Sequence, residues 1–172
     1  MKKVLLAAMA NALLYACAAH ESLLLFDNAA FDKAQADWAA HGIADYVFEV
    51  EEFVAGPRPA FRVTVLNGET ANIELVDDTW YDGSLCAEDR IDDDFARIWE
   101  IGTIPAVFNR IKSLEAKGAS MLHSLRKGAI ISLRVTYSSG YGFPKEMSWD
   151  VFTGGVGNGY DLEIRNFRPI AK

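Results

Sequence analysis

Cysteine and histidine are scarce in this chain of 172 residues, which has two cysteines, Cys17 and Cys86, and three histidines. Two cysteines are too few for the disulfide framework of a small secreted domain or for a cysteine-based zinc site. The histidines, His20, His41 and His123, lie far apart, and none falls in an HxH or HExxH spacing. The usual nucleus of a transition-metal site is therefore missing, and we expect no metal and no cofactor.

The sequence also lacks an apolar run long enough to span a bilayer, which takes about 20 residues. Its longest run begins at Val4, directly after Lys2 and Lys3, and continues to residue 16 with Asn11 as its polar interruption. A short apolar helix behind a basic start is typical of a secretory signal peptide. We therefore predict that residues 1–16 are a signal peptide.

The residues that end this run favour lipid attachment at Cys17. Leu14, Tyr15, Ala16 and Cys17 resemble the bacterial lipobox, which has a leucine three residues before the modified cysteine and a small residue directly before it. The resemblance implies an acylated N-terminus that holds the protein on a membrane of the bacterial cell envelope, facing the periplasm or the exterior. Two alternatives stay open: a cut after Ala18 that releases a soluble protein, and an ordinary apolar helix of a cytosolic domain.

The sequence also has fewer basic than acidic residues. Removal of residues 1–16 leaves 15 basic and 24 acidic residues, a net charge of −9. Such a surface repels nucleic acid and anionic lipid headgroups, so we expect no nucleic-acid partner and a membrane attachment made by the lipid anchor. About 156 mature residues are enough for one domain with a sizeable core.

The mature chain divides into a lipid-anchored tether, residues 17–30, and one domain, residues 31–172. Apolar residues at helical spacing predict a first helix that ends at Gly42 and a second that begins at Pro105 and ends at Gly118. Alternating apolar and polar residues between turn signals predict the strands. The predicted helices cover residues 31–41 and 105–117, and the predicted strands cover 45–53, 61–66, 69–76, 130–137, 145–150 and 160–167.

These elements predict an α+β fold with one antiparallel sheet of about six strands and two helices. Both halves of the domain have a helix followed by three strands, and FRVTVLNGETANIEL in the first half resembles LRVTYSSGYGFPKEMSW in the second. This order raises the hypothesis of a duplicated helix-plus-three-strand unit, although only the RVT tripeptide is identical.

An acidic insertion over residues 77–102 separates the two halves. Its carboxylates lack the alternation and the central glycine of a calcium loop, so a solvated acidic loop is the better interpretation. Its four aromatic residues, Trp80, Tyr81, Phe95 and Trp99, either pack over the sheet as a lid or form a binding surface. Packing as a lid is favoured, and the segment is still the best candidate for a contact with a partner.

A second aromatic candidate is the GYGFP segment, residues 140–144. It has neither the lysine nor the helix start of a phosphate-binding loop, so its glycines indicate a turn, on which Tyr141 and Phe143 pack or stack. Because no catalytic pattern is present, the expected function is a non-enzymatic binding or interaction role with an envelope protein or ligand. The alternatives are an inhibitor that inserts this turn into a periplasmic hydrolase, and a hydrolase with an unrecognised carboxylate pair.

Four segments together follow the pattern of a known family. The strongest is VTYSSGYGFPKEMSWD, with Tyr137, Gly142, Pro144 and Asp150 at its matching positions, and the others are WAAHGIADYVFEV, VTVLNGETANIEL and TIPAVFNRI. They resemble a bacterial family of envelope lipoproteins, the domain-of-unknown-function family numbered 6174, over about residues 31–168. The resemblance implies a shared fold and location but no chemistry, because that family has no assigned activity.

Overall fold

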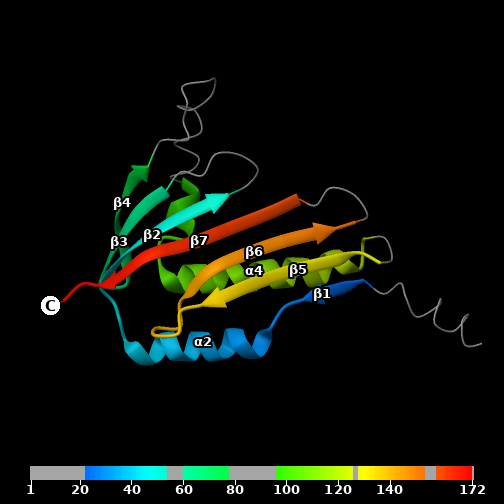
Figure 1. Cartoon of the computed structure of the whole chain (residues 1–172), viewed down its shortest axis with the longest axis horizontal. Helices are drawn as coiled ribbons and strands as arrows, with labels where there is room; N and C mark the ends of the chain where they lie inside the picture. The colour runs from blue at the N-terminus through cyan, green and yellow to red at the C-terminus, as the bar shows by residue number, and fades with distance from the viewer. Residues whose placement is uncertain (1–21, 54–59, 78–95, 126–127, 154–157, 172) are drawn as a thin grey trace, which may run out of the picture.

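The computed structural model describes residues 22–53, 60–77, 96–125, 128–153 and 158–171. Within these residues, seven strands form one sheet in the order β1-β5-β6-β7-β2-β3-β4, with two long helices beside it (Figure 1). A short helical segment covers residues 96–100. The helices are α2 (Asn28–His41) and α4 (Ile104–Leu122), and the strands are β1 (Leu23–Leu25), β2 (Tyr46–Phe53), β3 (Ala60–Leu66), β4 (Glu69–Asp77), β5 (Ile130–Tyr137), β6 (Pro144–Phe152) and β7 (Asn158–Pro169).

The predicted α+β class is confirmed, with two differences in the sheet. It has seven strands rather than about six, and it is not purely antiparallel, because β1 runs parallel to β5 with Leu23 opposite Ile130. The extra strand falls inside residues 17–30, the segment expected to be a tether. A run of three leucines has no alternation, and this is why strand periodicity did not identify it.

Both helices begin with a side-chain cap, but their ends differ. Asp27 accepts a hydrogen bond from the Ala30 amide at 2.9 Å, and Gly42 ends α2 in the left-handed conformation with φ of 60°. The prediction that Gly118 ends α4 is wrong, because the helix continues to Leu122. A Cβ atom at Gly118 would lie 2.8 Å from the Trp149 ring, so the glycine lets the helix approach the sheet closely.

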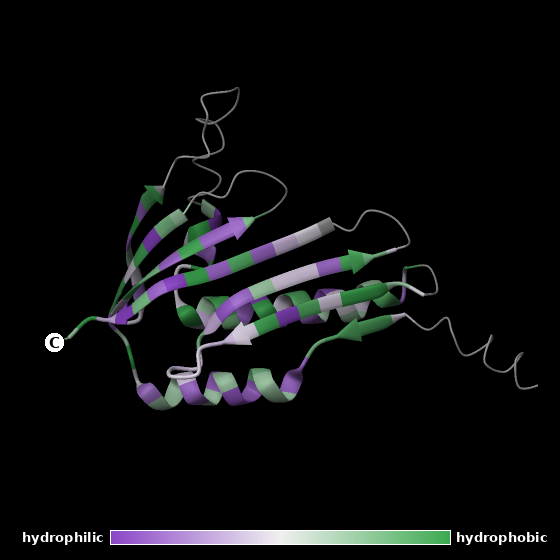
Figure 2. Cartoon of the chain, viewed as in Figure 1, coloured by the Kyte–Doolittle hydropathy of each residue, from purple (hydrophilic) through white to green (hydrophobic). Residues whose placement is uncertain are grey.

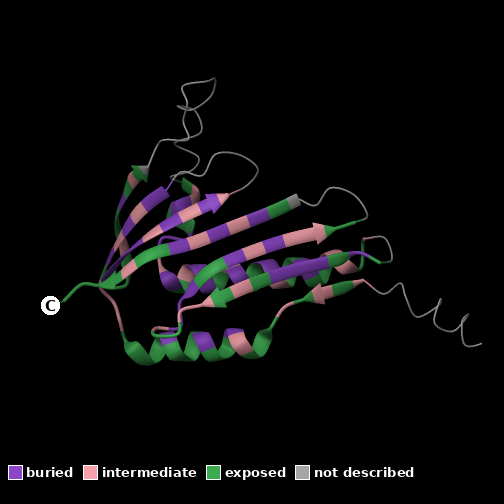
Figure 3. Ribbon diagram, viewed as in Figure 1, coloured by how far each residue is buried: buried purple, intermediate pink, exposed green. Residues whose placement is uncertain are grey.

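Among the described elements, helices cover one face of the sheet and none covers the other, which we call the open face. α4 contacts β1, β5 and β6 on the covered face, and α2 packs against α4 through the Phe31 and Phe108 rings, whose centroids are 5.5 Å apart. Buried and exposed positions alternate along the strands in Figure 3, as a sheet with one covered face requires. On β2, Phe48 and Val50 are buried while Glu49 lies on the open face.

The strands form two consecutive meanders, β2-β3-β4 and β5-β6-β7, which meet where β7 pairs with β2. The RVT tripeptide that begins at Arg62 lies on β3, the second strand of its meander. The one that begins at Arg134 lies on β5, the first strand of the other. The matching letters thus fall on strands that are not equivalent, and they give the duplication hypothesis no support.

Candidate functional site

A small pocket with a volume of about 190 Å³ lies between the covered face of the sheet and α4. Its walls come from the ends of β2, β6 and β7, from α4, and from the segment that precedes α4. The wall is partly apolar, with Ile101, Leu114 and Trp149. The polar side chains that line it are Glu52, Arg97, Glu100, Arg110, Lys117 and Tyr160.

Glu52 is the buried carboxylate of this pocket, and the alternation of β2 places it there. It continues the inward-facing series of Phe48 and Val50 and stands opposite Leu162 on β7, with its side chain only 6% exposed. A buried charge requires a partner. Arg97 supplies it by donating to the Oε2 atom of Glu52 through Nε at 2.8 Å and also through Nη2.

Two other groups in the pocket are buried hydrogen-bond donors without partners. The Tyr160 residue is 7% exposed, and within the part of the chain that the structure describes neither its hydroxyl nor the Nε atom of Arg110 makes a hydrogen bond of standard geometry, although Glu52 and Arg110 both lie close to the hydroxyl. The Arg110 guanidinium lies over the Tyr160 ring, 5.4 Å from its centroid. Burial raises the pKa of Tyr160, the charge and weak hydrogen bonding of Glu52 add to the increase, and those of Arg110 oppose it. The hydroxyl therefore keeps its proton at neutral pH.

The charges of the pocket favour a ligand that supplies acceptor atoms. Glu52 is neutralised by Arg97, and the remaining basic groups are Arg110 and Lys117, against the exposed Glu100. Arginine and tyrosine donors bind ionised oxygen atoms more strongly than neutral ones. The arrangement is therefore suited to a carboxylate or another small oxyanion.

The Tyr137 hydroxyl is also buried and unpartnered within the described residues, but its surroundings differ. Burial raises the pKa of Tyr137 to about 12, and the carboxylates of Asp27 and Asp32 add to the increase. The negative charge of these two carboxylates disfavours an anionic ligand at this position. Tyr137 is thus a natural control for Tyr160.

The open face of the sheet carries charges that satisfy one another. Arg165 donates to Glu163 through Nε at 2.7 Å and Nη2 at 2.6 Å, and to Glu51 through Nη1 at 2.7 Å. The hydrogen bonds that Arg165 donates to Glu163 raise the pKa of Arg165, so it stays charged. Because one arginine binds both carboxylates, Glu51 and Glu163 form an ion pair network and give no support to a hydrolase with a catalytic carboxylate pair.

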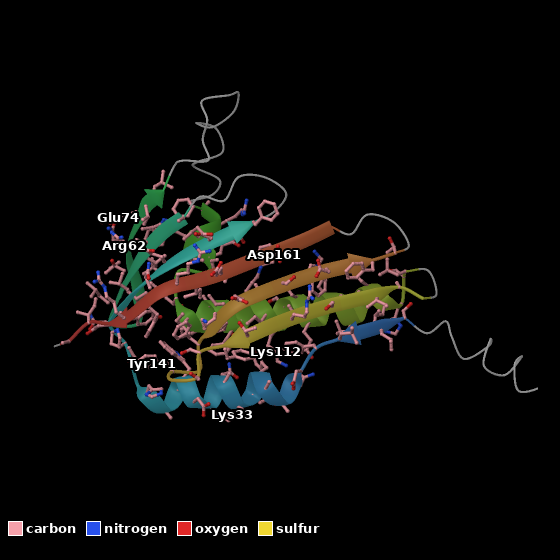
Figure 4. The ribbon with its side chains drawn as sticks, in the orientation of Figure 1. Lys33, Arg62, Glu74, Lys112, Tyr141 and Asp161 are labelled. Atoms are coloured by element: carbon pink, nitrogen blue, oxygen red, sulfur yellow. The ribbon has the colours of Figure 1, made fainter. Side chains whose placement is uncertain are left out.

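Charged side chains on the open face also pair with one another near β3 and β4. Glu49 accepts hydrogen bonds from Arg62 at 2.9 Å and from Asn166 at 2.6 Å, and these bonds lower the pKa of Glu49. Arg62 and Glu74 lie together on the adjoining strands in Figure 4, 3.9 Å apart. A hollow of about 460 Å³ follows this face over β5, β6 and β7, and it includes Asp161. Half of its lining residues are charged, and the others include Phe53, Met147 and Leu162.

The GYGFP turn packs against α2 and does not protrude. Phe143 is buried, and Tyr141 stacks on it while also contacting Phe167, with ring centroids 5.2 Å apart. A Cβ atom at Gly142, where φ is 79°, would lie 2.5 Å from the Ala34 carbonyl oxygen. Figure 4 shows Tyr141 beside α2. This packing gives the hypothesis of an inserted inhibitor loop no support.

Three of the other predicted binding residues, Trp80, Tyr81 and Phe95, lie outside the described residues, and so does the lipidation residue Cys17. Trp99 lies in the helical segment 96–100, is 51% exposed and does not line the pocket. In the same segment Ile98 is buried and Arg97 binds Glu52. The described end of the acidic insertion is therefore packed into the domain.

The residues of this pocket were not predicted from the sequence, although one signal for Glu52 was present. The alternation of β2 places Tyr46, Phe48 and Val50 inside, and its extension by one step puts a carboxylate in the core. A charged residue at an apolar position indicates a buried pair or a functional site. The sequence held no comparable signal for Tyr160, because tyrosine is an ordinary core residue.

The described ranges contain neither a metal-binding cluster nor a helix that could span a membrane. No group of three or more histidine, cysteine, aspartate or glutamate residues there could hold a metal ion. No helix there combines the length and the apolar character that crossing a membrane demands.

The architecture is that of an α+β domain with a single sheet and one helix-covered face. The chain belongs to the family of unknown function DUF6174, whose family model matches residues 30–169. Neither a curated protein nor a solved structure matches it. The resemblance in the sequence is thus confirmed at the level of the family.

Proposed function

We propose that this protein is a lipid-anchored binding protein of the bacterial cell envelope, and that its pocket holds a small organic carboxylate without converting it. The observation that carries the binding role is the pair of buried donors without partners, the Tyr160 hydroxyl and Arg110 Nε. Proteins rarely leave buried donors unpaired, because each costs about 1–3 kcal/mol. A ligand with two acceptor atoms would satisfy both donors once the Tyr160 and Arg110 side chains turn toward it, because both atoms are buried in the unliganded structure.

The size and the walls of the pocket define the ligand further. Its volume of about 190 Å³ is comparable with the roughly 150 Å³ cavity that accommodates benzene in another protein. Leu114 and the Trp149 ring would contact the apolar part of such a ligand, while its carboxylate accepts from Tyr160 and Arg110. A short carboxylate with one small ring or a short chain fits these limits.

Binding without conversion is supported by the lining of the pocket. The described lining residues include no serine, threonine, cysteine or histidine, which are the usual nucleophiles and bases. Its buried carboxylate, Glu52, is held by Arg97. These groups can orient a ligand.

The envelope location is supported by the sequence of residues 1–17, with a basic start, a short apolar run and a cysteine after Ala16. Replacement of Cys17 by serine should abolish the incorporation of radiolabelled palmitate. Palmitate that persists in Cys17→Ser would contradict lipid attachment at this residue. An envelope protein bound through residues 77–102, including Trp80, Tyr81, Phe95 and Trp99, is a further prediction.

A titration with benzoate tests the binding role. The mature protein is purified in detergent, and the indole N–H resonance of Trp149 is followed by NMR, with Trp149→Phe to assign it. We expect a saturable shift with benzoate and a weaker one with benzamide, which lacks the charge.

Two tyrosine variants give this titration its control. Tyr160→Phe should weaken benzoate binding about tenfold or more, since a hydrogen bond to a charged group is worth about 1.5–3 kcal/mol. Tyr137→Phe removes the other unpartnered hydroxyl, outside this pocket, and should leave the affinity unchanged. The absence of a saturable shift, or an equal loss of affinity in both variants, would contradict the proposal.

A further inference from the structure

A row of exposed apolar side chains crosses the edge of the sheet where the described chain begins. Leu23 on β1 stands opposite Ile130 on β5, and Ile130 stands opposite Phe152 on β6. These residues are 50%, 39% and 46% exposed. Figure 2 shows apolar colour along β1 and at the adjoining ends of β5 and β6. We call these three residues the edge row.

The edge row lies on the open face, away from α4. Strand alternation fixes this direction, because the next residue on β5, Ile131, is fully buried on the covered face. Leu24, the next residue on β1, packs against the core. Leu25 points to the same side as the edge row and is 50% exposed, which extends the apolar surface along β1. Such a contiguous apolar surface typically marks a contact with a protein or a membrane.

The distance along the chain to Cys17 argues for a membrane. Only residues 18–22 separate Cys17 from Leu23, and a chain rises at most about 3.6 Å per residue, so the two lie within roughly 20 Å of each other. An acyl group on Cys17 fixes that residue at the lipid surface. The edge row is therefore the part of the described sheet that is held nearest to the lipid.

The charge of the open face limits the contact to this edge. Beyond the edge row, the face carries Arg134 paired with Asp150 at 3.0 Å, and then Glu146, Glu163 and Glu51 in register across β6, β7 and β2. Carboxylates are disfavoured at the apolar boundary of a bilayer. Because this face is apolar at one edge and charged elsewhere, only the apolar edge can contact the lipid.

We propose that the edge row, together with Leu25, seats the domain on the lipid surface to which Cys17 anchors it. The inference rests on the lipid anchor of the proposed function and adds an orientation to it. β1, β5 and the end of β6 lie against the headgroups, and the β3–β4 edge points away from the membrane.

Spin-label accessibility in the anchored protein tests this orientation. Single cysteines replace Phe152 in the edge row or Leu66 on β3, in a Cys86→Ser background with Cys17 left for acylation. Leu66 is a matched control because it is also apolar and 43% exposed but lies outside the edge row. In phosphatidylcholine vesicles we expect the label at 152 to collide mainly with oxygen, which concentrates in lipid, and the label at 66 to collide mainly with a water-soluble nickel chelate.

The other outcomes separate the two proposals. Equal access of the nickel chelate to both labels, in protein that carries palmitate, would overturn the orientation and leave the anchor intact. Protein without palmitate at Cys17 would overturn both. Spin–spin broadening at position 152 that disappears on dilution would show that a second copy of the chain covers the edge row instead of lipid.

Discussion

The two faces of the sheet are built from the same strands, but their polar side chains differ in how they are paired. β2 contributes Glu51 to the open face and Glu52 to the covered face, and β7 contributes Glu163 and Tyr160 in the same way. On the open face the charged groups pair with one another, with Arg165 between two glutamates. Three buried donors, Tyr160, Arg110 and Tyr137, have no partner of standard geometry among the described residues, and the first two line one pocket. Abundant charge therefore does not point to a binding site here, and the proposed site rests on two unpartnered donors that line the same pocket.

Ion pairs on the two faces also contribute differently to the free energy of unfolding. Exposed ion pairs contribute about 0–1 kcal/mol each, because water screens both partners. A carboxylate that is almost fully buried depends on its partner, and loss of either member leaves an uncompensated group. Neighbouring residues of one strand should thus respond very differently to substitution.

The largest expected effect comes from Glu52→Ala compared with Glu51→Ala. Removal of Glu52 takes away a buried carboxylate that Arg97 binds and opens a hole beside Tyr160, so the free energy of unfolding should fall by about 2–4 kcal/mol. Removal of Glu51 leaves Arg165 bound to Glu163 and should cost less than about 1 kcal/mol. Urea denaturation measures both variants. Equal losses would show that the two faces are not distinct.

A second comparison uses two tyrosines that differ in hydrogen bonding. The buried Tyr46 hydroxyl accepts a hydrogen bond from the Ile104 amide at the start of α4, at 2.9 Å. Tyr46→Phe should therefore lower the free energy of unfolding by about 1–3 kcal/mol. Tyr160→Phe removes an unpartnered hydroxyl and should leave stability unchanged or raise it by up to about 1 kcal/mol. If thermal denaturation gives the opposite order, the Tyr160 hydroxyl has a structural partner.

A third expected effect, which appears only at alkaline pH, is a loss of stability. The folded-state pKa values of Tyr137 and Tyr160 lie above the ordinary value of 10, that of Tyr137 at about 12, mainly because both are buried. The protonated forms are favoured by the fold, so their contribution is complete below pH 10 and is lost as pH rises above it. The Tyr137→Phe/Tyr160→Phe double variant should lose less stability than the native chain between pH 10 and 12. Parallel urea denaturation series over this pH range would show whether the two curves separate.

The sequence was sufficient to predict the α+β class and most of the helices and strands, because local signals agreed with them. The Asn67-Gly68 turn has φ values of 54° and 81°, as a two-residue hairpin requires, and strand β5 has the predicted bounds. The failures have particular causes. Gly118 was expected to end a helix, but tertiary packing against Trp149 overrides its low helix propensity. The three-leucine strand β1 depends on its pairing with β5, which no local pattern indicates.

The pocket was less predictable than the fold. It is assembled from side chains distant in sequence, since Glu52 meets Arg97 and Tyr160 meets Arg110 only after the sheet and α4 have packed. Whether a donor is paired is a property of the folded molecule. Composition and spacing therefore pointed to the aromatic residues, and Tyr141 and Phe143 proved to be packing residues of the turn on α2.

A crystal structure of the protein grown with benzoate is the most direct test of the central claim. The account predicts density for one benzoate in the pocket, with carboxylate oxygens about 2.7–3.2 Å from the Tyr160 hydroxyl and from Arg110 Nε. Benzoate bound only at Arg165 or Arg62 on the open face, with the two donors still unpaired, would contradict it.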